Sequence, residues 1–119
     1  MVPALDELLL EAHESRDRFW FVQAVEITER TDTTITVRFM IGPDLFVQAF
    51  LSQNSGRLSF ALVGPSGRLC GCDRERETRH RHPFGQPDQH EPIPEGVSAR
   101  PLTQFMAEVA VLLIEHDLI

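Results

Sequence analysis

The residues best suited to chemistry lie in one short stretch, RHRHPFGQPDQHEP, which spans residues 79–92. It contains three histidines, two arginines and three prolines. His80 and His82 are two positions apart, so on a strand they would share one face, with Arg79 and Arg81 on the other. Two histidines that titrate near neutral pH can serve as a general base and a general acid. The spacing therefore raises the hypothesis of acid–base catalysis.

Cleavage of RNA through its own 2′-hydroxyl requires a base, an acid and a cation for the phosphate. Arg79 or Arg81 would supply the cation, because a guanidinium matches the geometry of a phosphate. Asp73 or Glu91 would orient an imidazole, and His90 lies close enough in the chain to join them. These residues predict a metal-independent ribonuclease. The alternative is a non-catalytic module, in which the same His/Arg/Pro loop orders itself or docks a protein or nucleic-acid partner.

A metal site is a further alternative, since Cys70, Cys72, His80 and His82 form a C-x-C-x7-H-x-H set. Zinc binds two thiolates and two imidazoles in a tetrahedron, but structural sites usually space the cysteines as C-x2–4-C. Two cysteines on one strand face are more often buried in a core. We therefore expect no metal and no other cofactor.

Composition limits the classes of protein that the chain can belong to. Its length of 119 residues predicts one domain, residues 1–119. The net charge of −7 disfavours a general nucleic-acid coat protein. All basic residues are arginine, and five of them fall within residues 68–81. Without a signal peptide or a membrane-spanning run, and with two cysteines too close to staple the fold, a cytoplasmic protein is expected.

Periodicity predicts the elements that must position these residues. Leucines spaced three and four apart, with Pro3 at the start, indicate a helix over about residues 3–14. Alternation of apolar residues from Ile35 to Ile41 indicates a strand with one buried face. Further strands are predicted at residues 19–27, 45–51, 57–63 and 68–72. The short turns between them favour antiparallel hairpins.

The rest of the chain consists of a polar connection and a second helix. Residues 73–100 are rich in proline and show no apolar period, so an irregular loop is expected. Pro101 then begins a C-terminal helix. The predicted fold is α+β in two layers: helix, five-stranded antiparallel meander sheet, long polar loop, helix. Val111 and Ile114 lie off the main apolar stripe of the last helix, and we expect the first helix to cover them, or else a partner.

Residues 57–115 resemble the TumE family. The resemblance rests on Asp73 at the end of a strand, on the run HRHPFG from His80, on Pro87 with His90, Glu91 and Pro92, and on LTQFMAEV in the final helix. Relatives show Asp-Asn where this chain has Asp73-Arg74, so any role of that asparagine is absent or replaced here. The relatives also do not share both cysteines.

The resemblance implies the toxin half of a bacterial toxin–antitoxin pair. Its partner would be a cognate antitoxin, a DNA-binding helix-turn-helix protein encoded beside it in this family. Most small toxins of this kind attack RNA or translation, so RNA is the implied target and a ribonuclease the implied activity. A homodimer is a further possibility for the C-terminal helix.

Overall fold

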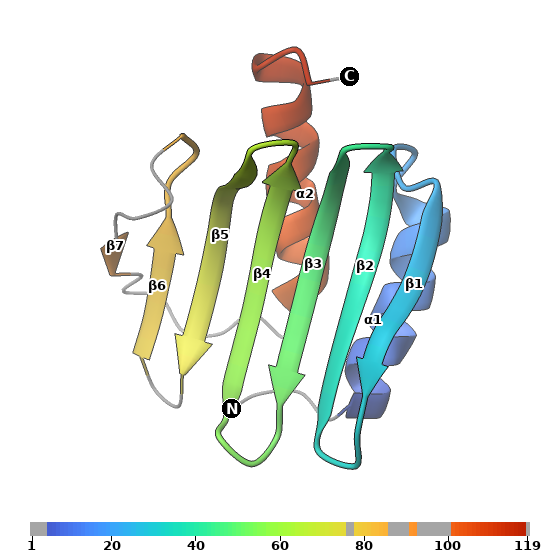
Figure 1. Cartoon of the computed structure of the whole chain (residues 1–119), viewed down its shortest axis with the longest axis vertical. Coiled ribbons are helices and arrows are strands. Elements are labelled where there is room, and N and C mark those ends of the chain that lie inside the picture. Colours follow the sequence, from blue (N-terminus) through green and yellow to red (C-terminus); the bar gives the residue numbers. More distant parts are fainter. Residues whose placement is uncertain (1–4, 76–77, 86–90, 93–100, 119) are drawn as a thin grey trace.

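The computed structural model describes residues 5–75, 78–85, 91–92 and 101–118; residues 74, 75, 78–82, 91, 92 and 101 are described by their backbone alone. Two helices flank a run of seven strands in chain order (Figure 1). The elements are α1 (Leu5–Arg18), β1 (Ala24–Arg30), β2 (Thr34–Gly42), β3 (Leu45–Ser52), β4 (Arg57–Gly64), β5 (Gly67–Glu75), β6 (Thr78–His82), β7 (Glu91–Pro92) and α2 (Pro101–Glu115).

The strands form one antiparallel sheet in which each strand pairs with the next along the chain. The predicted five-stranded meander is therefore confirmed. Tight turns connect the strands from β1 to β5, and Gly56 and Gly67 supply the positive φ angles of 69° and 120° that the turns into β4 and β5 require. The meander also continues beyond the expected five strands, because β5 extends to Glu75 and β6 and β7 follow within residues 73–100.

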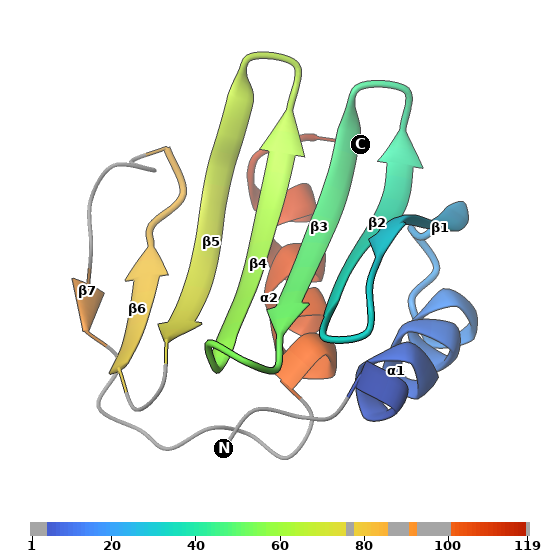
Figure 2. The ribbon, with the colours of Figure 1, turned by 60° about the horizontal axis from the view of Figure 1, so that its bottom comes forward.

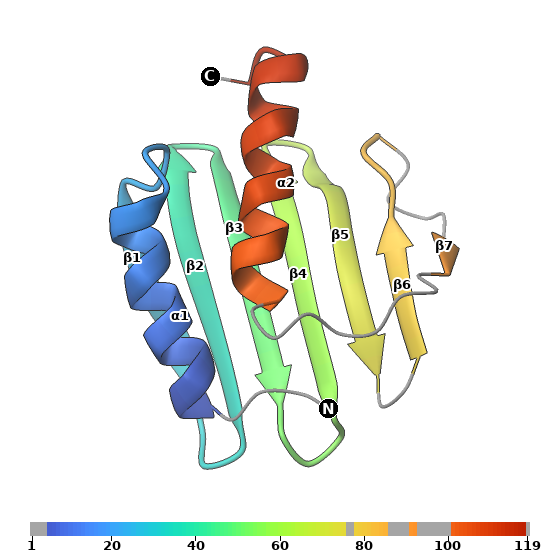
Figure 3. The ribbon, with the colours of Figure 1, turned by 180° about the vertical axis from the view of Figure 1, so that it is seen from behind.

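Both helices lie on one side of the sheet, as Figures 2 and 3 show from two directions. In Figure 3 the helices lie in front of the sheet, with α1 over β1 and β2 and α2 crossing β3 and β4. The burial of β2 follows this arrangement, since Ile35, Val37 and Phe39 are fully buried while the residues between them are partly exposed. We call the face under the helices the helix side and the other face the open face.

The first helix is longer than its apolar period predicts, and it ends at Arg18. Its Glu11 is buried, and the carboxylate accepts a hydrogen bond of 2.7 Å from the backbone N–H of Thr103 in α2. The strand predicted to begin at Phe19 begins only at Ala24, because residues 19–23 form the connection after α1. The prediction of a strand was therefore wrong for residues 19–23.

The C-terminal helix begins at Pro101, as predicted, and buries one stripe of side chains. Leu102, Phe105, Met106, Val109 and Leu113 belong to the core. Val111 and Ile114, in contrast, are 53% and 66% exposed. The expectation that the first helix covers these two side chains is wrong. Within the described part of the chain, neither helix has the length and apolar character that crossing a membrane requires.

Candidate functional site

The register of the sheet brings three candidate residues to one region of the open face. Asp73 on β5 pairs with Ser59 on β4 and with His80 on β6. Residues paired directly across antiparallel strands occupy the same face, with neighbouring strands about 4.8 Å apart. The next row contains Ala61, Gly71 and His82. His80 and His82 therefore occupy adjacent positions on the open face, about 6.8 Å apart along β6.

The carboxylate of Asp73 is held by two side chains. The hydroxyl of Ser59 donates a hydrogen bond of 2.5 Å to Oδ1 of Asp73. Arg68 places Nη2 at 3.3 Å from both carboxylate oxygens. The Arg68 and Asp73 side chains remain 32% and 21% exposed, so solvent still reaches the ion pair. These contacts fix the orientation of the carboxylate at the position next to His80.

Gly71 allows Arg68 to reach Asp73. A Cβ atom at residue 71 would collide with Nη2 of Arg68 and would lie 2.8 Å from its Nε. It would also lie 2.7 Å from the backbone carbonyl oxygen of Phe60. The guanidinium therefore passes closely over the backbone of β5 where a side chain would otherwise stand. Since His82 pairs with Gly71, the register places His82 beside this crossing point.

A register shift puts Arg68 on the open face. Val63 pairs with Arg68 and Leu62 pairs with Cys70, so Leu69 is an extra residue in β5. Strict alternation would put Arg68 on the same face as Cys70 and Cys72, under the helices. The bulge reverses this assignment. Arg68 and Ser59 are the site residues that the sequence did not identify, although Arg68 belongs to the cluster of five arginines within residues 68–81.

The remaining candidate residues are not brought to this region. Arg79 pairs with Arg74, and Arg81 pairs with Cys72 and Glu91. These positions belong to the helix side of β5, β6 and β7. His90 lies outside the described residues. The register thus groups Asp73, His80 and His82 on one face and Arg79, Arg81 and Glu91 on the other.

The cysteines occupy the face opposite the two histidines. Cys70 and Cys72 pair with Leu62 and Phe60, two core residues under α2. Because His80 and His82 belong to the open face, the four residues cannot surround one metal ion. Cys70 is 5% exposed and packs in the core, as the sequence predicts.

The chain after β6 returns to the sheet and to the end of α2. Gly85, with a φ angle of 78°, donates a backbone hydrogen bond of 2.9 Å to the carbonyl of Leu69. The ring of Phe84 stacks on the imidazole of His116, with 3.9 Å between ring centroids and 17° between planes. These contacts fix the chain three residues after His82, and they connect it to the bulge that positions Arg68.

The fold and this site define a two-layer α+β protein with a His/Asp/Arg group on an open sheet face. No family model matches the chain, and comparisons with curated proteins and with solved structures find no match for it. The resemblance to the TumE family therefore stays a prediction.

Proposed function

We propose that the protein is a small ribonuclease that uses His80 and His82 as an acid–base pair and needs no metal. The observation that carries the proposal is the register, which puts His80 beside the oriented carboxylate of Asp73 and His82 beside Arg68. A carboxylate favours the protonated form of a neighbouring imidazole, and a guanidinium favours the neutral form. His80 is then the general acid and His82 the general base.

The reaction follows from these two roles. Neutral His82 removes the proton of a ribose 2′-hydroxyl, and the 2′-oxygen attacks the adjacent phosphorus. The bond from phosphorus to the 5′-oxygen of the next nucleotide breaks, and that oxygen takes a proton from His80. The products are a 2′,3′-cyclic phosphate and a free 5′-hydroxyl. Two positions about 6.8 Å apart on one strand face leave room for one phosphate between the imidazoles.

Arg68 is the arginine that supports this chemistry best. A guanidinium stabilises the negative charge that develops on a phosphate during transfer. Arg79 and Arg81 were the arginines expected to bind it, but their register positions lie on the helix side of β6. Arg68 reaches the open face through the bulge and is held in place by Asp73.

The proposed biological role is that of a toxin in a bacterial toxin–antitoxin pair, acting in the cytoplasm. This role rests on the resemblance of residues 57–115 to the TumE family. The alternative function is a binding module without catalysis. One observation favours it: Val111 and Ile114 present apolar side chains to solvent from α2, as a partner-binding helix would.

The test is cleavage of a short single-stranded RNA by the purified chain in the presence of a chelator. His80→Ala and His82→Ala are each expected to lower the rate by about 10²–10⁴-fold, since each removes a proton-transfer group. His13→Ala, on the exposed surface of α1, is the matched control and should leave the rate unchanged. Full activity in both site variants would contradict the proposal and leave the binding module as the better account.

A further inference from the structure

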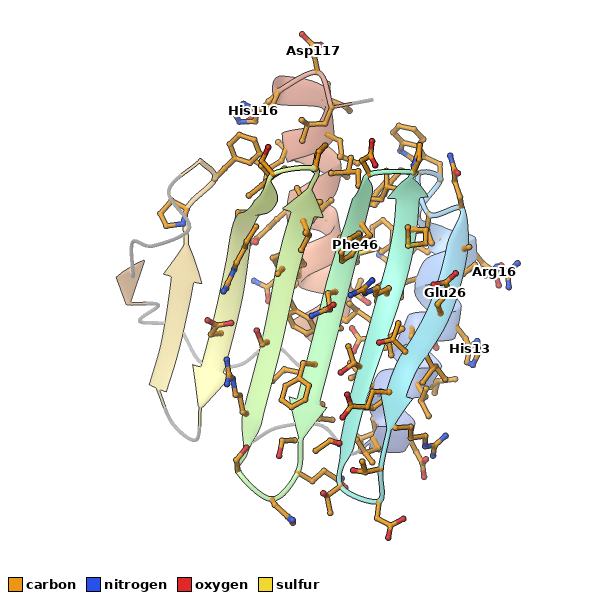
Figure 4. The ribbon with its side chains drawn as sticks, in the orientation of Figure 1. His13, Arg16, Glu26, Phe46, His116 and Asp117 are labelled. Carbon is orange, nitrogen blue, oxygen red and sulfur yellow. The ribbon has the colours of Figure 1, made fainter. Side chains whose placement is uncertain are left out.

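The centre of the open face carries aromatic side chains outside the core. Phe46 and Phe50 lie on the same face of β3, four residues apart, and both are partly exposed. Neither belongs to the core cluster under the helices. Figure 4 shows Phe46 on the face that is turned away from both helices. Aromatic rings on an open sheet face are flat apolar surfaces on which a nucleic-acid base can stack.

An arginine is fixed next to these rings. The guanidinium carbon of Arg38 on β2 lies 4.6 Å from the centroid of the Phe46 ring. Its Nε donates a hydrogen bond of 3.1 Å to Oε1 of Gln48 on β3. The ring and the amide together hold the guanidinium over the sheet, where its other N–H groups can meet a phosphate or its plane can stack on a base.

The charged residues of this region are paired across the strands. The strands β2, β3 and β4 contain no Asp or Glu. Their only charged residues are Arg38 and Arg57, which both occupy open-face positions. Each pairs directly with a glutamate on the next strand, Arg38 with Glu26 on β1 and Arg57 with Glu75 on β5. The surface therefore has no excess of positive charge, and a nucleic acid on it would be held chiefly by its bases.

The aromatic region is continuous with the candidate site. Phe50 pairs with Ser59, which pairs with Asp73, which pairs with His80. At about 4.8 Å between strands, Phe50 lies about 14 Å from the His80 position along this row. A single-stranded nucleic acid that crosses the sheet from β3 to β6 would therefore pass over both Phe50 and the candidate site.

We propose that the open face binds single-stranded RNA, with Phe46 and Phe50 stacking on bases and Arg38 and Arg57 contacting phosphates. We call these four residues the platform. The proposal rests on the proposed ribonuclease function, and it names the surface that delivers the substrate to His80 and His82. The binding energy comes chiefly from stacking, so it has little dependence on base identity.

The test measures RNA affinity separately from cleavage. A fluorescein-labelled single-stranded RNA of mixed sequence is titrated with the His80→Ala/His82→Ala chain, which leaves the RNA intact, and anisotropy is recorded at several salt concentrations. Phe50→Ala should weaken binding by about 5- to 150-fold and leave the salt dependence unchanged, because it removes a stacking surface. Arg38→Gln should weaken binding and reduce the slope of log affinity against log salt by about 0.7, because it removes one phosphate contact.

Two controls keep the result interpretable. Phe46→Leu and Phe50→Leu preserve apolar bulk if an alanine variant fails to fold, and they should still weaken binding. Val111→Ser, exposed on α2 on the helix side of the sheet, should leave affinity unchanged. Unchanged affinity in all platform variants would overturn the proposal, as would the absence of any RNA binding.

The two proposals can fail separately. If binding depends on the platform but the chain with both histidines does not cleave RNA, the ribonuclease is wrong and the platform stands. If the chain cleaves RNA and Phe50→Leu changes neither KM nor affinity, the platform is wrong and the ribonuclease stands.

Discussion

Arg68 lies across Gly71 and places one guanidinium nitrogen 3.3 Å from both carboxylate oxygens of Asp73. Both partners come from β5, five residues apart, and the bulge at Leu69 brings them to one face. The arrangement depends on a glycine between them. It therefore gives a direct test of whether the position of Arg68 matters for function.

Gly71→Ala should displace Arg68 and destabilise the protein. The tip of Arg68 can move away from a new Cβ, but the carbonyl oxygen of Phe60 at 2.7 Å belongs to the neighbouring strand and cannot. Overpacking of this kind costs about 1–3 kcal/mol of unfolding free energy. Gly42→Ala is the control, because nothing lies within 4 Å of a Cβ at that residue. Urea denaturation and RNA cleavage of both variants check the prediction, and equal behaviour of the two would contradict it.

Asp73→Asn should change the pH dependence of cleavage. An acid and a base acting together give a bell-shaped profile, in which the fall at high pH reports loss of the proton from the acid. The Asp73 carboxylate favours the protonated state of the neighbouring acid, so its removal should move the high-pH limb to lower pH. The low-pH limb, which reports the base, should move less. A profile that falls uniformly without any shift would indicate a purely structural role for Asp73.

Alternation and turn residues were sufficient to predict most of the fold. Apolar residues at every second position from Ile35 to Ile41 indicate one buried face, and β2 has that face under the helices. The pattern fails where the backbone departs from regular pairing. Residues 19–23 look like a strand because they are aromatic and apolar, but Phe21 and Val22 are buried in the connection after α1.

The candidate site was predictable only in part, because here too the backbone departs from regular strand pairing. The two-residue spacing of His80 and His82 predicts a shared face whenever the segment is a strand, and β6 provides that strand. The bulge in β5 leaves no comparable trace in the sequence, so Arg68 could not be assigned to that face. Ser59 was equally hidden, because its role depends on pairing between β4 and β5 rather than on local pattern.

Glu11→Ala should destabilise the protein from a position far from the candidate site. Glu11 is 6% exposed, and its carboxylate accepts a hydrogen bond from the N–H of Thr103, one of the first-turn donors of α2 that have no partner within the helix. Hydrogen bonds to a charged group contribute about 1.5–3 kcal/mol, and the negative charge also suits a helix N-terminus. Glu7→Ala, exposed on the same helix, should cost at most about 1 kcal/mol. Equal losses in urea denaturation would contradict this role.

Val111→Glu with Ile114→Glu should leave the fold intact and remove assembly with a partner. Both side chains are more than half exposed on α2, so two carboxylates there remain solvated and should change the unfolding free energy by about 0.5 kcal/mol or less. Leu113→Glu is the matched control, since Leu113 is fully buried and an unpaired charge at its position should unfold the domain. Circular dichroism checks the fold, and light scattering and co-purification with the proposed antitoxin check assembly.

Unfolding of the double variant would contradict the exposure of this face. A folded double variant that still assembles normally would show that the partner binds elsewhere, which would remove the observation that favours a binding module.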